Sequence, residues 1–393
     1  MGRGKRHSER ARLAPVMGRL ADICPHSPDF GLDWPALEDA LPLSPLAECP
    51  QEPVHHGEGN VLAHTKLACE ALVADPAWRS LDEAGRQEVF LAALLHDIAK
   101  AQTTREQEGR LTSPGHARRG AIEARRLLWQ LGMAPAARER VCALIRHHMV
   151  PYFLVEATQE EPQIARRRAL GISLTAGCGR LSMLARADAH GRIAKSAPEI
   201  ELAAELFSDY CAELGCLSKP YPFPSDHSRF LYFRRPGRDP AYTAYDDTAG
   251  RAIMMHGLPG AGKDAYIDKY LPLLPVVSLD TIREELGIPA GKPQGAVIQL
   301  ARERAREHLR VGADFIWNAT SISRAQRETT IALFTAYNAR VEIVAVEVDF
   351  ALHEEQNRAR DAAKVVPERA IARMLERWEY PDLTECHQLI AWP

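Results

Sequence analysis

The 393-residue sequence lacks the features that define several classes of protein. No apolar run approaches the roughly 20 residues that a membrane-spanning helix needs. Lys and Arg (49) nearly balance Asp and Glu (52), and the net charge of -3 excludes the strong basic field of a protein that coats nucleic acid. The eight cysteines form no CxxC pair, which argues against a zinc ribbon. We therefore expect a cytoplasmic protein with reduced thiols and no membrane partner.

The first 20 residues carry six Lys or Arg and one Glu, and no apolar core follows them. This composition does not fit a secretory signal. We interpret the segment as a basic tail, with a weak contact to a phosphate backbone as the alternative.

Changes of pattern along the chain predict two domains of different architecture. Between 59 and 216, apolar residues recur at spacings of three and four, which predicts helices over 60–73, 85–99, 116–131, 136–149, 181–190 and 198–214. From 251 onward, helical stretches alternate with short apolar runs at 252–257, 275–280, 314–319 and 341–350, as in βαβ units with a parallel sheet. The predicted organisation is an N-terminal extension at 1–50, an all-α domain at 51–216, a linker at 217–250 and an α/β domain at 251–393.

The predicted linker is rich in proline and aromatic residues. Its segment 229–235 interleaves basic and aromatic side chains, as a surface that stacks single-stranded bases does. A strand that packs the two domains together explains the segment at least as well.

The helical half carries His and Asp at positions where the apolar pattern predicts the core. His64, for example, lies in line with Val61 and Ala68. Burying an unpaired imidazole or carboxylate costs several kcal/mol, so such groups need partners. Imidazole with carboxylate suits one or two ions of Mn, Co, Ni, Fe or Zn, and separately satisfied histidines are the alternative. The candidate metal ligands are His64, His96, Asp97, His116, His147, His148 and Asp188.

The order of these ligands resembles the HD phosphohydrolase superfamily over about 55–195. The segments LLHDIAK (94–100), GHARRGA (115–121), IRHHMVP (145–151) and LARADAHGR (184–192) also resemble the HD module of bacterial tRNA nucleotidyltransferases. The resemblance implies metal-assisted hydrolysis of a phosphate ester, with Asp97 in a catalytic role.

Basic side chains near the predicted ligands are candidates to bind the substrate. Lys100 lies one turn after His96, and Arg119 lies three residues after His116, so either can neutralise a phosphate. The alternative is a solvated basic face. The loop pair at 55–56, His-His, is a further candidate for a metal or substrate contact, with a plain loop as the alternative.

Residues 257–264 read GLPGAGKD and follow an apolar run, which is the strand–loop–helix setting of a P-loop. Gly257, Gly260 and Gly262 let backbone N–H groups approach the phosphates of an NTP. Lys263 then reaches the β and γ oxygens. Asp264 stands where P-loops usually carry Ser or Thr. A carboxylate there can bind Mg²⁺ directly or through water, but its charge lies closer to the phosphates, so the metal-ligand role of Asp264 stays open.

Polar residues end the next two predicted strands. Asp280 can accept a proton from an attacking hydroxyl, and Arg283 can hold a substrate phosphate. A helix N-cap with an i,i+3 ion pair is the alternative. Asn318 and Thr320 are candidates to orient Mg²⁺-bound water, with a simple turn as the alternative.

Two arginines, Arg358 and Arg360, precede Val366-Pro367, which breaks a helix. A helix–turn–helix that carries arginine over a P-loop is typical of a lid, where the guanidinium stabilises the transferred phosphoryl charge. Arg360 is the stronger candidate, and Arg358 is also explained as a surface charge.

The segments GLPGAGK, SLDTIR and QNRARDAAKVVP resemble the phage-type polynucleotide 5′-hydroxyl kinase family over about 251–380. The resemblance implies Lys263 as the P-loop lysine and Asp280 as the general base for the 5′-OH. It also implies Arg283 as a ligand of the terminal nucleotide's phosphate and Arg360 as the lid arginine. P-loop kinases of small molecules share parts of this set.

An HD hydrolase followed by such a kinase resembles the bacterial HD-Pnk family of bifunctional end-healing enzymes. The resemblance implies a 5′-OH kinase that uses ATP or another NTP with Mg²⁺, and a metal-dependent phosphatase for 3′, 2′ or 2′,3′-cyclic phosphates. The expected partners are RNA or DNA ends and a nucleic-acid ligase. The alternatives are an HD nucleotidase fused to a nucleoside or sugar kinase, and a non-catalytic nucleotide-binding scaffold.

Overall fold

The computed structural model describes residues 23–289, 291–360 and 365–392. The basic tail predicted for the first 20 residues lies outside the described residues. The chain divides into two compact units, Met1–Tyr221 and Pro222–Pro393. Among the described residues, no helix is both long enough and apolar enough to cross a membrane.

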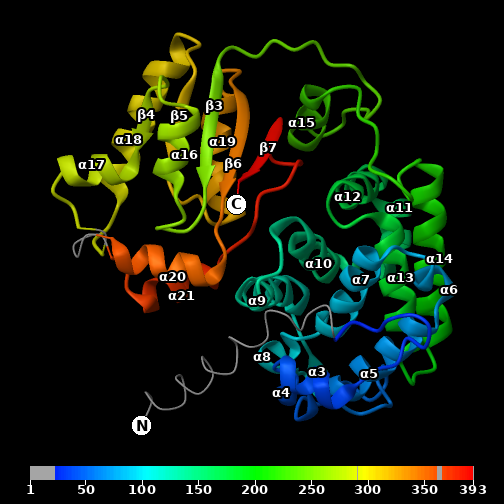
Figure 1. Ribbon diagram of the computed structural model, residues 1–393. Coiled ribbons are helices and arrows are strands. Elements are labelled where there is room, and N and C mark those ends of the chain that lie inside the picture. Colours follow the sequence, from blue (N-terminus) through cyan, green and yellow to red (C-terminus); the bar gives the residue numbers. More distant parts are fainter. Residues whose placement is uncertain (1–22, 290, 361–364, 393) are drawn as a thin grey trace. The chain divides into compact units, whose positions relative to one another are not determined.

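The N-terminal unit is helical, as predicted (Figure 1). The helices predicted between 60 and 214 are all present, with ends shifted by up to four residues. Among the described residues of this unit, the helices that were not predicted are α3, α4, α6, α8, α11 and α12, whose bounds follow. The helices are α3 (Trp34–Ala40), α4 (Ser44–Ala47), α5 (Val61–Ala74), α6 (Pro76–Arg79), α7 (Glu83–Leu95), α8 (Lys100–Thr103), α9 (His116–Gln130), α10 (Pro135–His147), α11 (Val150–Glu160), α12 (Pro162–Thr175), α13 (Cys178–His190) and α14 (Ala197–Glu213).

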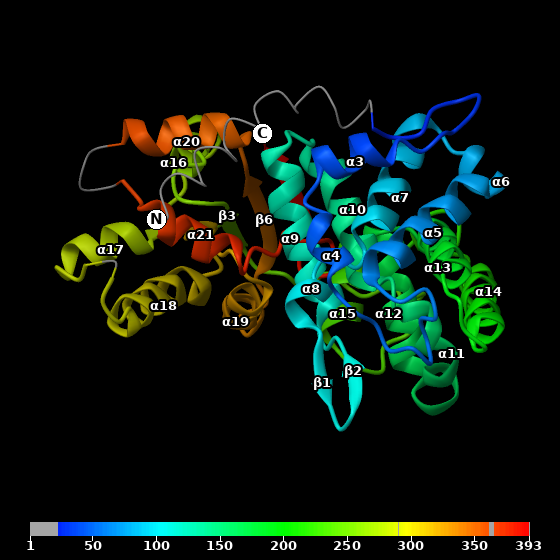
Figure 2. The ribbon, with the colours of Figure 1, turned by 90° about the horizontal axis from the view of Figure 1, so that it is seen from below.

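A short hairpin interrupts these helices, contrary to the expectation of a purely helical segment. Strands β1 (Arg105–Gln107) and β2 (Arg110–Thr112) pair antiparallel. Glu108 and Gly109 between them have φ of 53° and 75°, as a primed two-residue hairpin turn requires. Figure 2 shows the hairpin projecting from the helices of this unit. Three-residue strands are too short to produce a recognisable alternation in the sequence.

Side-chain caps define where two ligand-bearing helices begin. Asn60 Oδ1 accepts a hydrogen bond from Ala63 N at 2.8 Å, which starts α5. Asp82 Oδ1 accepts one from Gly85 N at 2.8 Å, which starts α7. Helices α5, α7, α10 and α13 then pack around one core. Fully buried members of this core include Leu72, Phe90, Leu144 and Leu181.

The C-terminal unit is built on five parallel strands in the order β4-β5-β3-β6-β7, which confirms the predicted fold class. The four predicted strands are present, and the last strand was not predicted. The elements are α15 (Asp226–Arg234), β3 (Arg251–His256), α16 (Lys263–Tyr270), β4 (Val276–Ser278), α17 (Leu279–Glu285), α18 (Gly295–Arg310), β5 (Phe315–Asn318), α19 (Arg324–Thr335), β6 (Arg340–Val346), α20 (Phe350–Ala359), α21 (Glu368–Leu375) and β7 (Gln388–Trp392).

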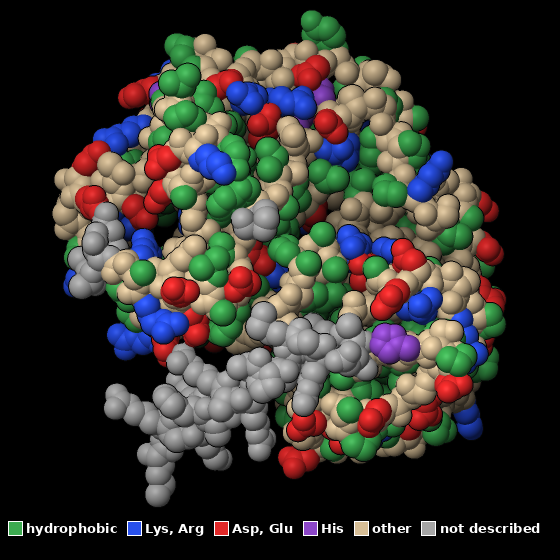
Figure 3. Space-filling model, viewed as in Figure 1, with side chains coloured by type: hydrophobic (Ala, Val, Ile, Leu, Met, Phe, Trp, Pro, Cys, Tyr) green, Lys and Arg blue, Asp and Glu red, His purple; other side chains and the backbone are tan. Residues whose placement is uncertain are grey.

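Helices cover both faces of this sheet. Ala252 and Met254 of β3 lie in a core cluster with residues of α18 and α19, whereas Ile253 and Met255 lie in a second cluster with residues of α16. Since all five strands are parallel, their carboxyl ends lie along one edge, where α/β proteins bind ligands. On the face seen in Figure 3, basic and acidic side chains are interspersed.

Both interpretations of the segment 229–235 are wrong, because the segment belongs to the helix α15 rather than to a strand, and its rings are buried rather than exposed for stacking. Phe230 and Tyr232 are 2% and 6% exposed, and Phe230 lies in a core cluster with sheet residues. Arg229 Nη2 donates to His387 O at 2.6 Å, so this arginine is also turned inward. Rings in a core are not accessible to nucleic-acid bases.

A buried ion pair ties α19 to the segment before β7. Arg327 donates from Nε and Nη2 to the two carboxylate oxygens of Glu385 at 2.8 and 2.9 Å. Its Nη1 donates to the carbonyls of Ser321 and Glu379 at 3.1 and 2.7 Å. Both charges are tolerated in the interior because each has hydrogen-bond partners.

We expect Arg327→Ala to lower the free energy of unfolding by about 3–5 kcal/mol, because it leaves Glu385 buried without its partner. Arg304→Ala is the control, since its pair with Glu285 is exposed, and we expect little change from it. Urea denaturation of the full chain measures both. Equal effects of the two substitutions would contradict the stabilising role of the buried pair.

Candidate active sites

One buried carboxylate lies at the centre of the predicted histidine cluster. Asp97 follows the end of α7 and is 2% exposed. Its Oδ2 lies 3.2 Å from His96 Nε2 and 4.0 Å from His64 Nε2. Its Oδ1 lies 3.5 Å from His116 Nε2 and 3.9 Å from His148 Nε2. The two oxygens therefore face two different pairs of imidazoles.

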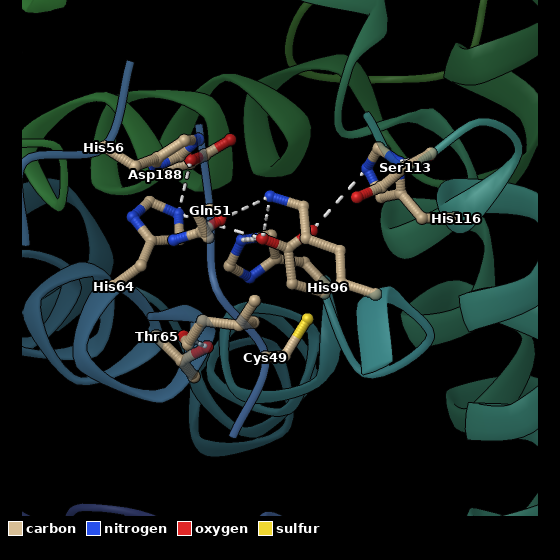
Figure 4. A network of polar contacts seen from close by, with 12 residues as sticks. Cys49, Gln51, His56, His64, Thr65, His96, Ser113, His116 and Asp188 are labelled. Carbon is tan, nitrogen blue, oxygen red and sulfur yellow. Dashed lines mark hydrogen bonds and ion pairs between the residues drawn. The ribbon is translucent and has the colours of Figure 1, made fainter. Parts of the chain in front are cut away.

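A second buried carboxylate, Asp188 of α13, completes the side of the cluster that holds His64. Asp188 Oδ1 lies 2.9 Å from His64 Nε2, and Figure 4 shows these two side chains pointing toward each other. The potential ligand atoms fall into two groups, each with all its atoms within 4.8 Å of one another. The groups are His64 with His96 and Asp188, and Asp97 with His116 and His148.

Backbone carbonyls orient the imidazoles. The Nδ1 atoms of His96, His116 and His148 each donate at 2.7 Å to the carbonyl three residues earlier. His64 Nδ1 donates to Gly191 O at 3.1 Å. In His96, His116 and His148 the proton therefore lies on Nδ1, and Nε2 presents its lone pair to the centre of the cluster. This is the arrangement that histidine ligands of metals adopt. His64 Nε2, by contrast, also contacts the acceptor Asp188 Oδ1 at 2.9 Å.

Two buried polar atoms of the cluster, His96 Nε2 and Asp97 Oδ1, have no hydrogen-bond partner among the described residues. Leaving such atoms unsatisfied in the interior is costly, and a cation between the two groups would satisfy both. The donor set of imidazole nitrogens and carboxylate oxygens therefore fits one or two transition-metal ions.

Nearby cations keep both carboxylates ionised. Burial alone would raise the pKa of Asp97, but Lys100 and the imidazoles hold it well below its usual range. For Asp188, Arg192 and His64 outweigh burial in the same way and lower the pKa. Both side chains are therefore in the deprotonated form that ligates a metal.

A cavity of about 190 Å³ opens beside the cluster. Its lining includes the ligand His116 together with His56, Lys100 and Arg192. Lys100 Nζ lies 2.7 Å from Asp97 Oδ2 and donates to Gln51 Oε1 at 2.8 Å. The cavity thus brings two cationic side chains close to the proposed metal ligands, as recognition of a phosphate requires.

Two of the predicted residues lie elsewhere. Arg119 does not line this cavity, because its Nη2 pairs with Glu123 Oε1 at 2.7 Å along α9, so the geometry gives no support to substrate binding by Arg119. His147 ends α10 half-buried and belongs to neither ligand group. A metal contact from His147 stays a prediction.

The structure adds four residues to the cluster. The sequence analysis missed Glu58, Tyr152 and Arg192, and it left the role of His56 open. Glu58 Oε1 lies 2.7 Å from His56 Nδ1 and 3.1 Å from His64 Nδ1, so these three side chains form another group of potential ligands. Tyr152 donates to Asp188 Oδ2 at 2.7 Å, and Arg192 Nη2 donates to Asp188 Oδ1 at 3.0 Å. The spacing of Glu58 between two histidines was the available signal, but no periodic pattern identifies Tyr152 or Arg192.

In the C-terminal unit, the predicted P-loop connects β3 to α16. Gly257, Gly260 and Gly262 have φ of 149°, 85° and 95°. A Cβ at Gly257 would lie 2.3 Å from Val346 O of β6, so only glycine permits this approach. Gly257 N also donates to Thr320 O at 3.1 Å, which ties the loop to the segment after β5.

The side-chain nitrogen of Lys263 contacts backbone carbonyls of the P-loop. Its Nζ donates to Gly257 O at 3.1 Å and to Leu258 O at 2.9 Å. Burial lowers the pKa of Lys263 to about 8, although Asp264 and Asp280 oppose this change. The charge of Arg360 lowers the pKa further. Asp280 and Arg360 are therefore close enough to Lys263 to act on its charge.

Asp264, at the position where P-loops usually carry Ser or Thr, contacts the last residue of β5. Asn318 Nδ2 donates to Asp264 Oδ1 at 2.7 Å. Both side chains lie at the carboxyl edge of the sheet, beside the P-loop. An oxygen of each is of the type that Mg²⁺ prefers, which fits a nucleotide-bound magnesium ion at this edge.

Asp280 and Arg283 form the i,i+3 ion pair that was one alternative for them. The N-cap part of that alternative is wrong, because Ser278 Oγ caps α17 by accepting from Thr281 N at 3.2 Å. The Asp280 side chain is 74% exposed, and Arg283 Nε also donates to Gln294 Oε1 at 2.9 Å. The carboxylate is accessible to a substrate.

The predicted lid region packs on the P-loop. His353 Nε2 of α20 donates to Pro259 O at 3.0 Å, a contact that the sequence analysis missed. Arg360 follows the end of α20, and its Nη1 is buried with no hydrogen-bond partner among the described residues. A phosphate oxygen would supply one. Arg358 Nε donates to Glu354 O at 3.1 Å, and Arg358 is exposed, as expected of a surface charge.

Comparisons with known proteins match each unit to a different family. A family model described as "HD domain" matches residues 61–170, and one described as "AAA domain" matches residues 253–381. The chain is also 38% identical over 115 residues to the protein named "Multifunctional CCA protein" of Halorhodospira halophila (strain DSM 244 / SL1). That alignment covers 29% of this chain and 25% of the relative, so the chain spans about a quarter of the length of this curated protein.

The chain joins an HD-phosphohydrolase domain to a P-loop kinase-like domain. The histidine–aspartate cluster belongs to the HD domain, and Lys263 with its neighbours belongs to the P-loop domain. The pairing of the two families in one chain confirms the family resemblance on which the sequence analysis rested.

In the HD domain, we expect Asp97→Ala to weaken metal binding at both ligand groups by at least about tenfold, because the two oxygens face different histidine pairs. Asp188→Ala should affect only the group that contains His64. Equilibrium dialysis against Mn²⁺ with elemental analysis measures the stoichiometry. His190→Ala, an exposed histidine on the same helix as Asp188, is the control and should bind as the wild type does. Equal loss in the Asp97 and His190 variants would refute this arrangement.

In the P-loop domain, we expect binding of MgATP to take up a proton. The Lys263 ammonium loses its proton as the pH rises through about 8, and bound phosphates favour the charged form. Uptake should be about half a proton at pH 8 and near zero at pH 6, where Lys263 is already charged. Calorimetry in buffers of different ionisation enthalpy measures it. Lys269→Met, an exposed lysine of α16, should leave uptake unchanged. Identical uptake at both pH values would contradict the assignment.

Proposed function

We propose that this protein repairs nucleic-acid ends, adding a phosphate to a 5′-OH and removing a phosphate from the other end. The P-loop domain acts as the 5′-OH kinase, with ATP or another NTP and Mg²⁺. The HD domain acts as the metal-dependent phosphatase for a 3′, 2′ or 2′,3′-cyclic phosphate. One chain then converts a strand end that a ligase cannot join into one that it can.

The observation that carries this proposal is the accessible Asp280–Arg283 pair beside Lys263, in the same chain as a hydrolytic HD site. A kinase for a hydroxyl needs a carboxylate at the edge of its phosphate site to accept the proton. A polynucleotide differs from a nucleoside in carrying a phosphate on its first linkage. The Arg283 guanidinium, held next to the Asp280 carboxylate, is suited to that phosphate.

In the kinase reaction, Lys263 holds the β and γ oxygens of the NTP, and the Asp280 carboxylate accepts the proton of the 5′-OH. Arg283 holds the phosphate of the terminal nucleotide. Arg360 supplies positive charge to the transferred phosphoryl group. Its buried Nη1, which has no hydrogen-bond partner among residues 23–289, 291–360 and 365–392, supports this role. Asp264 and Asn318 would hold Mg²⁺, which neutralises the phosphate charge when bound.

In the phosphatase reaction, His64, His96, His116, His148, Asp97 and Asp188 would hold the metal. This would be a transition metal, whose chemistry when bound would be polarisation of the phosphate and activation of the attacking water. Lys100 and Arg192 bind the phosphate oxygens from the cavity side. The cavity of about 190 Å³ is smaller than the roughly 300–1,000 Å³ of sites for whole drug-sized ligands. This size supports recognition of an end group.

The test is an oligonucleotide with a 5′-OH and a 3′-phosphate, incubated with ATP and a panel of divalent ions, followed by analysis of both ends. We expect a 5′-phosphate and a 3′-OH. Free nucleosides and sugars tested in parallel address the small-molecule kinase alternative, which would be favoured if they were phosphorylated and the oligonucleotide were not. Absence of both reactions would favour a nucleotide-binding scaffold.

We expect the two activities to be separable. Asp280→Ala should lower kinase activity by about 10²–10⁴-fold and spare the phosphatase, because it removes only the proton acceptor. Asp97→Ala should abolish phosphatase activity and spare the kinase. Steady-state assays of both activities on each variant measure this. Asp268→Ala, an exposed carboxylate on α16, is the control and should retain both activities. Loss of both activities from either single change would contradict two independent sites.

A further inference from the structure

Three buried cysteines meet at the junction of α13 and α14, away from the ligand groups of the HD cluster. Cys178 is the first residue of α13, Cys211 lies in the last turn of α14, and Cys216 follows that helix. All three are 0% exposed, and their Sγ atoms lie within 4.8 Å of one another. All three are free thiols.

The backbone sets the positions of these thiols. Gly215 has a φ of 70°, and Cys216 N donates to Cys211 O at 2.8 Å, which is the Schellman turn that brings these two side chains together. The next residue, Leu217, accepts a hydrogen bond at its carbonyl from Gly179 N at 2.9 Å. That bond anchors the turn against the start of α13 and places the thiol of Cys178 beside the other two.

The spacing of the sulfur atoms suits a metal ion rather than a disulfide. Cys178 Sγ and Cys216 Sγ are 4.0 Å apart, about twice the length of an S–S bond. Two thiolates that bind one ion at about 2.3 Å have sulfur atoms about 3.8 Å apart in a tetrahedral site and about 4 Å apart in a trigonal plane. The Cys178–Cys216 separation matches the trigonal value, and all three sulfur atoms lie within 4.8 Å of one another.

The residue type at these three positions also points to a ligand role. Three apolar residues of similar size would fill this space equally well, so packing alone does not require that all three be cysteine.

We propose that Cys178, Cys211 and Cys216 form a buried site for one soft metal ion bound by three thiolates. Sulfur ligands select Zn²⁺ or Cu⁺ over hard cations, and the site is chemically distinct from the imidazole and carboxylate groups of the HD cluster. The bound ion cross-links the start of α13 to the end of α14. Because α13 also carries Asp188, the site would hold in place the helix that supplies a ligand of the HD cluster.

The test is titration of the full chain, reduced and kept free of oxygen, with Cd²⁺ as the probe for Zn²⁺ and with Cu⁺ in a second arm. Mn²⁺ is added first to occupy the HD cluster. Sulfur-to-metal charge transfer in the ultraviolet reports thiolate binding alone, since imidazole and carboxylate ligands give no such band. We expect the band to saturate at one ion per chain in one or both arms.

Matched variants locate the ion. Cys211→Ala and Cys69→Ala each remove one fully buried thiol of the same unit, but only the first belongs to the cluster. We expect Cys69→Ala to keep the band and Cys211→Ala to bind at least about tenfold more weakly. The same loss is expected of Cys216→Ala, which provides a second test if one variant fails to fold.

Three results would overturn the proposal. The first is a wild-type protein that gives no charge-transfer band with either ion, a result that needs no variant. The second is a band that persists in Cys211→Ala and Cys216→Ala. The third is oxidation in place of metal uptake, seen by mass spectrometry as a disulfide between Cys178 and Cys216 in protein that binds no ion after reduction.

Discussion

The HD domain depends on one buried carboxylate that is shared between two pairs of imidazoles. Asp97 directs one oxygen toward His64 and His96 and the other toward His116 and His148. A buried carboxylate without such partners would take up a proton. Burial of the imidazoles would then cost free energy that no interaction with the carboxylate offsets. The cluster is therefore both the chemical site and the reason why polar groups persist in the core.

The P-loop domain buries a positive charge where the HD domain buries a negative one. Its lysine, Lys263, must be placed to bind the phosphates of a nucleotide. Lys263 rests on two carbonyls of its own loop, and burial lowers its pKa to about 8. The close approach of Gly257 to β6 holds that loop against the sheet edge. Arg360 Nη1 is buried and has no hydrogen-bond partner within the part of the chain that the structure describes. Phosphate oxygens would supply partners of opposite charge to both Lys263 and Arg360.

Most of the candidate site residues could be predicted from local pattern. Ionisable residues stand where the helical pattern predicts apolar ones, or follow a glycine-rich loop after a strand. Asp97 and His148 stand in core-facing helical positions, and Lys263 closes a glycine-rich loop after a strand. Spacing was less informative where the same residue types have two structural uses. Arg119 pairs along its own helix, and its substrate contact stays a prediction. The rings of 229–235 pack into a core, because sequence spacing does not say which face of a helix is covered.

The sequence by itself determined the two fold classes, the ligand-type residues and the phosphate loop, because periodicity and local spacing encode these directly. Only the tertiary structure decided which of the candidates meet. It brought Glu58, Tyr152 and Arg192 to the HD cluster and Asn318 to Asp264. It also gathered three thiols that are up to 38 residues apart. Such contacts depend on how helices and strands pack at long range, and no local pattern in the chain records that packing.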